Sequence, residues 1–287
     1  MPPLHLALLL GVAIVHVAAH IAIKRARRRW AFLWWMTLAG NLAFLPLLSQ
    51  VRLVPPAGWV VILLSALFEL AYYGAVVVAY QSGDLSLAYP LSRGSAPLFL
   101  SLWGLLLLSE QPTSLGLAGI LSIAVGLYTV NLPRLGDWAA PLQSLRNAGP
   151  RWALFGGLCI SAYTAVDKVG VGYVSPLLYI YLVFIVAWVL ITPVIWRMGG
   201  WGALRDEWES GKWAIMLAGV VTLAAYAVVL WVIRSGTPAI YAGAVREMSV
   251  VLAALAGAVG LREGKLVPRL LGAAFVAAGV ALIALAG

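Results

Sequence analysis

Long apolar runs alternate with short polar segments along the whole chain. Ten of these runs have about the 20 residues that a membrane-spanning helix needs. They cover residues 4–23, 30–48, 58–80, 86–109, 114–131, 152–171, 175–197, 212–233, 238–261 and 266–286. Because backbone groups in lipid must find their partners within the protein, we predict that all ten runs are helices.

The second half of the chain repeats the first half. A shift of 153 residues, which takes Arg93 to Arg246, superposes the two halves without a gap from Tyr73 onward. The matched positions are Tyr73 and Tyr226, Ser82-Gly83 and Ser235-Gly236, Arg93 and Arg246, Gly104 and Gly257, Glu110 and Glu263, Gly119 and Gly272, and Gly126 and Gly279. Charged residues inside apolar runs rarely match by chance, so the register indicates a duplication.

Each half contains five predicted helices, so the second half must cross the membrane in the opposite sense. Such inverted-topology repeats are the design by which many secondary transporters alternate access around a midplane site. We therefore expect an all-α polytopic membrane protein of ten transmembrane helices. Its parts would be a first five-helix repeat (1–131), a connecting loop (132–151) and a second five-helix repeat (152–287).

Composition and charge agree with this class. The chain is 63% hydrophobic and 10% charged, whereas soluble domains are about 45–50% apolar and about 25% charged. A soluble enzyme and a nucleic-acid-binding domain are thereby excluded. Fourteen of the 19 Lys and Arg residues fall in the loops on one side when both termini are placed on the other. Because positive loops face the cytoplasm, we predict a multi-pass protein of the cell (inner) membrane with both termini outside.

Six charged residues lie within the apolar runs or at their edge: Glu69, Arg93, Asp167, Lys168, Arg246 and Glu247. Their charges sum to zero. Charges at membrane depth are costly and mark binding or coupling sites. The alternative is a set of structural ion pairs that lock helices together, and for Lys168 we favour a position at the outer interface.

Glu69 shares a helix face with several tyrosines, and Arg93 lies in a run interrupted by prolines. The acid could carry a proton or attract an ammonium group, and the rings could stack on a cation; a plain aromatic packing stripe is the alternative. Arg93 could grip a carboxylate or a phosphate, or pair with Glu69. The candidate substrate-binding set is Glu69, Tyr72, Tyr73, Tyr80, Tyr89, Arg93, Tyr163, Asp167, Tyr226, Tyr241, Arg246 and Glu247.

No cofactor or metal is expected. His16 and His20 are spaced as metal ligands can be, but their run holds no acidic residue or cysteine to complete a site. The chain has no phosphate-binding loop in a supporting context, so energy must come from a gradient or from a partner, with protons as the candidate coupling ion. The partners expected are a small-molecule substrate and the lipid bilayer, with no nucleic acid. The sequence sets no oligomeric state, and a monomer is compatible with it.

Two segments resemble the fourth and fifth helices of EamA-type carriers, which belong to the drug/metabolite transporter (DMT) superfamily. The first is YPLSRGSAPLF (Tyr89–Phe99), followed by a leucine-rich run to Glu110 and a helix with Gly119 and Gly126. The second is Val245–Lys265, followed by a helix with Gly272 and Gly279, although Leu261-Arg262-Glu263-Gly264 departs from the usual small residue before the acid. The resemblance implies a ten-helix carrier with a central cavity between its halves.

The function expected is secondary transport of small amphipathic or zwitterionic metabolites, such as amino acids or amines. Export by alternating access is the direction that the resemblance favours, and the chain is not expected to be an enzyme. Two alternatives stay open. A flippase for a lipid or lipid-linked intermediate would need a lateral opening between helices. A membrane-embedded enzyme would need a clustered catalytic set, which the sequence lacks.

Overall fold

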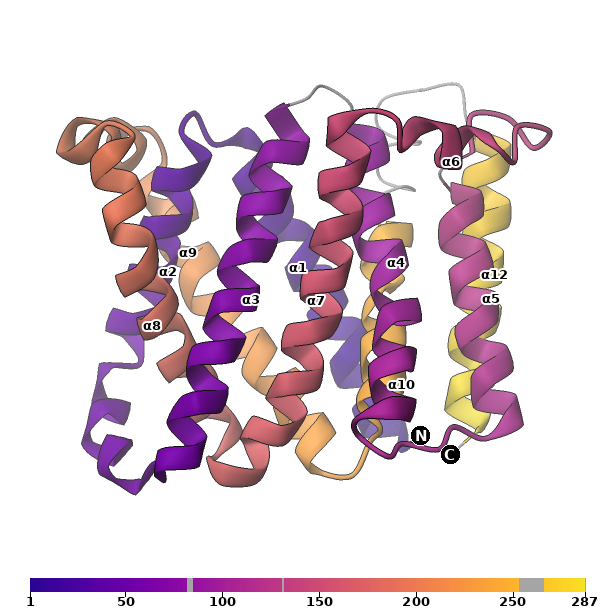
Figure 1. Cartoon of the computed structure of the whole chain (residues 1–287), viewed down its shortest axis with the longest axis horizontal. Coiled ribbons are helices and arrows are strands. Elements are labelled where there is room, and N and C mark those ends of the chain that lie inside the picture. Colours follow the sequence, from indigo (N-terminus) through magenta and orange to yellow (C-terminus); the bar gives the residue numbers. More distant parts are fainter. Residues whose placement is uncertain (82–84, 131, 253–265, 287) are drawn as a thin grey trace.

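The computed structural model describes residues 1–81, 85–130, 132–252 and 266–286, and over these residues the chain is helical (Figure 1). The long helices are α1 (Pro3–Arg25), α2 (Arg29–Ala43), α3 (Pro56–Gln81), α4 (Leu85–Leu106), α5 (Ser114–Val130), α7 (Ala148–Tyr173), α8 (Pro176–Arg197), α9 (Gly200–Arg234) and α12 (Leu266–Leu285). Shorter ones are η1 (Leu45–Leu53), α6 (Ala140–Ser144) and α10 (Ala239–Arg246). The side chains of Tyr80 and Tyr89, and residues Gly257 and Glu263, lie outside the described residues.

Several helices begin where proline occupies the first turn, as at Pro3 and Pro176. Proline has no amide hydrogen, but amides in the first turn have no acceptor within the helix, so proline costs no hydrogen bond there. The helix α9 has a break at Gly211, where φ is −159°. Its first part, up to that break, covers most of the polar connection at 198–211.

Six described helices are long and apolar enough to cross a bilayer: α1, α3, α7, α8, α9 and α12. The pair α2 and η1 would be a seventh span, but it is bent by 71°. The protein is therefore an all-α polytopic chain, while the count of ten in two sets of five stays a prediction. A single straight helix over 30–48 is wrong, because α2 ends at Ala43 and the chain turns sharply before Pro46. Likewise, the run predicted as 238–261 is interrupted at Glu247, where α10 ends.

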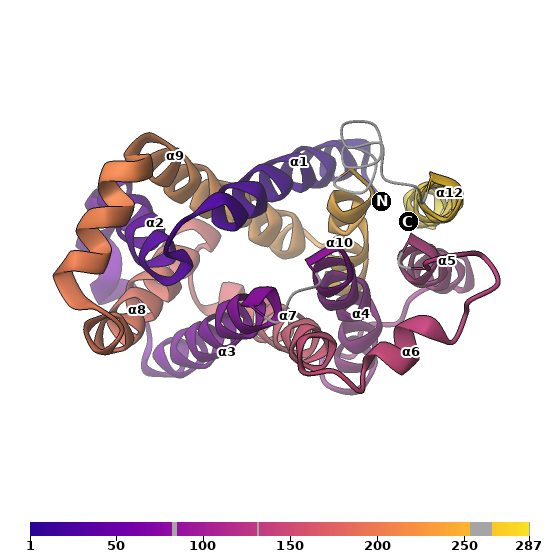
Figure 2. The ribbon, with the colours of Figure 1, turned by 90° about the horizontal axis from the view of Figure 1, so that it is seen from above.

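The helices form two facing rows (Figure 2). One row holds α3, α7 and α4, and the other holds α9, α1 and α10. The contacts follow the sequence repeat: α3 packs on α7 as α1 packs on α9, and α4 on α7 as α10 on α1. The helices α5 and α12 pack on each other at one end of the bundle. Each row therefore mixes helices from both halves of the chain, and a site between the rows is built by both.

Small residues allow α5 and α12 to touch along their backbones. A Cβ atom added to Gly126 would lie 2.6 Å from the carbonyl oxygen of Gly272, and one added to Gly119 would lie 2.7 Å from that of Gly279. Such distances are closer than side chains allow, so only glycine fits at both positions. Small residues at this spacing are the usual means of close helix packing in membranes.

Both termini lie at the same end of the molecule (Figure 1). The Met1 ammonium group donates a hydrogen bond to the carbonyl oxygen of Ala284 at 2.9 Å. We call this the terminal end. The opposite end, which we call the basic end, carries the link between α1 and α2 with Arg27, Arg28 and Arg29, and also α6. The predicted placement of the basic end in the cytoplasm stays a prediction.

Candidate functional site

A small cavity lies between the two rows of helices. Its volume is about 30 Å³, enough for one or two water molecules. Its walls come from both halves of the chain: His16, His20, Met36, Glu69, Tyr72, Tyr73 and Arg93 from the first, and Tyr163, Phe184, Thr222 and Tyr226 from the second, among others. Six of the predicted site residues are in this set. A metabolite would need the helices or side chains to move apart before it could enter.

Glu69 lies in the middle of α3 and is 9% exposed. Within the described part of the chain, its carboxyl group makes no hydrogen bond or ion pair. It faces the cavity beside Tyr72 and Tyr73, whose ring centroids are 5.1 Å apart. The predicted face of Glu69 and tyrosines therefore lines a cavity instead of filling a dry core.

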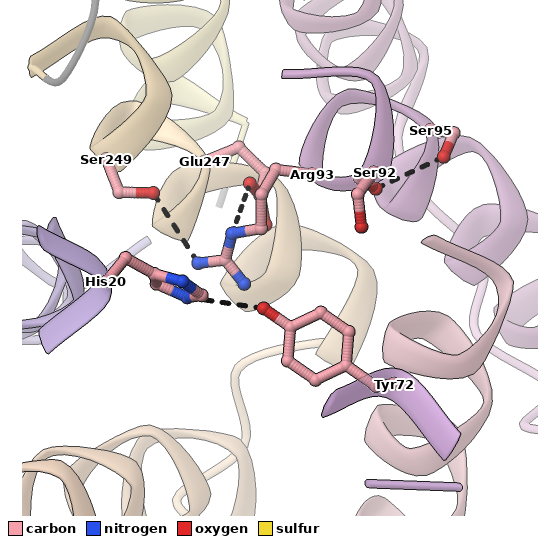
Figure 3. A network of polar contacts seen from close by, with 7 residues as sticks. All are labelled: His20, Tyr72, Ser92, Arg93, Ser95, Glu247 and Ser249. Atoms are coloured by element: carbon pink, nitrogen blue, oxygen red, sulfur yellow. Dashed lines mark hydrogen bonds and ion pairs between the residues drawn. The ribbon is translucent and has the colours of Figure 1, made fainter. Parts of the chain in front are cut away.

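Aromatic rings continue from α3 across the cavity. The rings of Tyr72 and Tyr163 have centroids 6.2 Å apart, and Tyr163 meets Tyr226 edge to face at 5.9 Å. The Tyr72 hydroxyl and His20 Nε2 share a hydrogen bond at 3.2 Å (Figure 3). This series of rings spans both halves of the chain and presents π faces to whatever enters.

Arg93 is buried on α4 and points to the second half of the chain. Its Nε lies 3.2 Å from Glu247 Oε2, and its Nη2 donates to Ser249 Oγ at 3.5 Å (Figure 3). The partner of Arg93 is therefore Glu247, not Glu69 as one alternative had it. Ser249 carried no signal in the sequence, because a serine in an apolar helix is common.

Asp167 is fully buried on α7. Its Oδ1 accepts hydrogen bonds from Ser65 Oγ at 2.5 Å and Tyr179 Oη at 2.9 Å, and its Oδ2 accepts one from Tyr226 Oη at 2.6 Å. The Tyr226 ring then lies under Arg246, whose Cζ is 5.5 Å from the ring centroid. Neither Ser65 nor Tyr179 was predicted. Their roles depend on helix pairing, which a single sequence does not give.

The comparisons with known proteins follow this geometry. The model of the EamA-like transporter family matches residues 4–132 and 147–285. The chain belongs to the EamA-like transporter family. No curated protein matches its sequence. A solved structure described as "Crystal structure of protein" has a TM-score of 0.71 and 16% identity, covering 99% of this chain and 98% of that one. At that identity the likeness concerns the fold alone.

As a member of this family, the chain is a multi-pass membrane transporter of the DMT type. Members of the family are transporters and not enzymes, in line with the expected function class. The residues matched, 4–132 and 147–285, leave the segment 133–146 between the two family regions. The domain boundaries predicted from the repeat remain a prediction.

On the basic end of this EamA-like transporter, a second pocket of about 190 Å³ lies close to the cavity. It is lined by Arg27, Arg28, Arg29, Trp30, Ala31, Val77, Ile195, Met198 and Ala203. Trp30 and Tyr73, which lines the cavity, pack against the same buried core, and Trp30 would touch a Cβ added to Gly74.

On the terminal end, the transporter is closed by polar contacts around Glu110. Lys168 Nζ lies 2.6 Å from Glu110 Oε1, and the backbone amides of Ala239 and Ile240 donate to its two oxygens at 2.7 and 3.1 Å. We call these four residues the terminal-end polar cluster. Nearby, the Tyr241 hydroxyl accepts a hydrogen bond from the amide of Thr113 at 3.0 Å. Tyr241 thus lies away from the cavity, and neither it nor Lys168 is placed to touch a substrate there.

Proposed function

We propose that the chain is a secondary carrier for small amphipathic or zwitterionic metabolites, with amino acids and amines as the leading classes. The observation that supports it is the cavity between the rows, which the first half lines with the buried charges Glu69 and Arg93 and which both halves line with tyrosine rings. In carriers built from inverted repeats, such midplane sites bind the substrate while the halves move around it.

The two ends of the protein support alternating access. We infer that the terminal-end polar cluster closes the terminal end, whereas the basic end has a pocket of about 190 Å³. A substrate would therefore approach from the basic end in this conformation. If that end faces the cytoplasm of the cell (inner) membrane, as the charge bias favours, the direction is export, and both termini lie outside.

Reconstituted uptake tests the proposal. The full chain in proteoliposomes is screened with amino acids and amines, with and without a pH gradient. We expect flux of at least one candidate that depends on the gradient, and loss of that flux in Glu69→Gln and Arg93→Ala. Arg205→Ala is the matched control, because Arg205 pairs with Glu209 on the exposed surface of α9. Absence of flux for every candidate, or unchanged flux in both cavity variants, would contradict the proposed site.

The flippase alternative is tested in the same vesicles. Fluorescent phospholipids in the inner leaflet are reached by an impermeant quencher only if the protein moves them. We expect no such movement, because charged and hydroxyl-bearing side chains line the cavity, where acyl chains would need an apolar path.

A further inference from the structure

The buried centre of the protein contains more carboxylates than cations. Among the described residues, the charged side chains buried between the rows are Glu69, Arg93, Asp167, Arg246 and Glu247, none more than 9% exposed. We call them the central charge cluster. Two cations face three carboxylates. The six charges counted from the sequence summed to zero because they included Lys168. In the structure, Lys168 instead pairs with Glu110 in the terminal-end polar cluster.

Two of the three carboxylates already have compensation. Glu247 lies 3.2 Å from Arg93. Asp167 accepts three hydroxyl hydrogen bonds, and one of the donors, Tyr226, also stacks beneath Arg246. An ionised carboxylate only accepts hydrogen bonds, so three donors favour the charged form. Arg93 is thereby balanced by direct contact with Glu247, whereas Arg246 contacts the Tyr226 ring and makes no ion pair among the described residues.

Glu69 is the carboxylate without such compensation. No cation lies within ion-pair distance of it in the described part of the chain, and it opens onto the cavity. A lone buried carboxylate charge is too costly to persist unless a cation or a proton joins it. The central charge cluster therefore has a place for one additional positive charge, at Glu69.

We propose that Glu69 binds one monovalent cation at a time: a proton in the empty carrier, and the ammonium group of an amine substrate in the loaded carrier. This inference rests on the proposed function and narrows its substrate class to amines. A carboxylate on the substrate is not required, because Arg93 is already engaged by Glu247 and Ser249. The exchange is balanced: the ammonium enters, the carboxylic acid becomes a carboxylate, and one proton leaves.

The surroundings of Glu69 fit both occupants. A cavity of about 30 Å³ has room for the proton-bound form but not for a metabolite. When the cavity widens, the tyrosine rings beside Glu69 offer π faces to an ammonium group. The titratable and charged groups around Glu69 come from six helices and the turn after α10: His16 and His20, Tyr72 and Tyr73, Arg93, Tyr163 and Asp167, Tyr226, Arg246 and Glu247. Of these, only the two histidines normally titrate near neutral pH and could compete for the role.

Proton release on binding is the first test. Three probes share one aromatic ring: phenylethylamine is a cation, phenylalanine a zwitterion and phenylacetate an anion. Each is added to the purified full chain in weakly buffered detergent solution. We expect phenylethylamine to bind and to release about one proton per molecule. Over the pH range in which Glu69 of the empty carrier is protonated, its affinity should rise about tenfold for each unit by which the pH increases. Glu69→Gln should release none, and Glu69→Asp should restore release.

Several outcomes would overturn the inference. Binding of phenylethylamine without proton release is one. Release retained in Glu69→Gln but lost in His16→Gln is another, because it assigns the proton to a histidine. Transport of phenylalanine with no binding of phenylethylamine also overturns it, yet leaves the proposed function standing.

A second measurement needs no ligand and therefore decides the matter if no probe binds. Infrared spectra of the empty carrier should contain the carbonyl stretch of one protonated carboxyl group at neutral pH, and Glu69→Gln should remove it. Glu110→Gln is the matched control that should retain the band, because Glu110 lies outside the cavity and already contacts Lys168 and the amides at the start of α10. A wild-type spectrum with no band that Glu69→Gln removes overturns the inference.

Discussion

Replacing Glu110 with glutamine should weaken the terminal end of the carrier. The side chain of Glu110 is 6% exposed and joins the α4–α5 connection of the first half to the start of α10 in the second. Glutamine has the same size, but it loses the ion pair with Lys168 and keeps one acceptor oxygen instead of two. The amide group also brings an N–H toward the start of α10, where backbone donors already point and an acceptor is preferred.

The magnitude follows from the contacts. One lost charge-assisted hydrogen bond costs about 1.5–3 kcal/mol. The ion pair adds only about 0.5–1 kcal/mol, because the Lys168 side chain is 29% exposed and solvent screens it. We expect Glu110→Gln to cost about 2–4 kcal/mol in total. Lys168→Met leaves both amide contacts in place and should cost about 0.5–1 kcal/mol.

Thermal unfolding of the full chain in detergent measures both variants. A chain of this size loses about 2–4 °C of Tm per kcal/mol. Glu110→Gln should therefore lower Tm by about 4–16 °C and Lys168→Met by about 1–4 °C, while the surface variant Arg205→Gln leaves it unchanged. An effect of Lys168→Met as large as that of Glu110→Gln would refute the reasoning, because the helix-start contacts would then contribute nothing.

Two other substitutions test the packing around the site. Asp167→Asn replaces an acceptor of three hydroxyl groups with an amide, so we expect a loss of about 3 kcal/mol in unfolding free energy together with reduced uptake, since Tyr226 loses its anchor; thermal unfolding and proteoliposome flux check the two effects. Gly126→Val inserts a side chain 2.6 Å from the Gly272 carbonyl oxygen and should cost at least about 1–3 kcal/mol, seen as a lower Tm. Gly11→Val is its control, because nothing lies within 4 Å of a Cβ at that position.

The apolar runs predicted most helices to within a few residues. The run at 58–80 is α3 (Pro56–Gln81), that at 175–197 is α8 (Pro176–Arg197), and that at 114–131 is α5 (Ser114–Val130). Hydropathy works here because a helix buried in lipid must be apolar over a fixed length. The boundaries follow from proline and from polar residues at the membrane surface.

Hydropathy does not reveal bends inside an apolar run. The run at 30–48 bends by 71° between α2 and η1, and the run at 238–261 is interrupted at Glu247. At the first bend the flanking residues Leu42, Ala43, Phe44 and Leu45 are as apolar as those of an unbroken helix, whereas the second interruption falls at the charged pair Arg246 and Glu247. Broken helices are tolerated at membrane depth when neighbouring helices satisfy the freed backbone groups.

The candidate site was predicted in part. Intramembrane charge and helix periodicity identified Glu69, Arg93 and the tyrosines Tyr72, Tyr163 and Tyr226, all of which line the cavity. The pairings were not predicted, because they depend on which helices meet. The hydroxyl groups that donate hydrogen bonds to Asp167 could not be predicted from the sequence either, because serine and tyrosine occur throughout apolar helices.

The charge imbalance arises where the two halves of the chain differ. The shift of 153 residues places Arg246 opposite Arg93, so the duplication supplies both cations. The same shift places Thr222 opposite Glu69. Both side chains line the cavity, but the second half has a threonine where the first half has a carboxylate. The arginines therefore follow the pseudo-symmetry of the fold, whereas the acid that faces the cavity exists in one half only. A symmetric scaffold can move around a central site in two directions, and under the proposal above the single carboxylate of Glu69 would bind a cation in both.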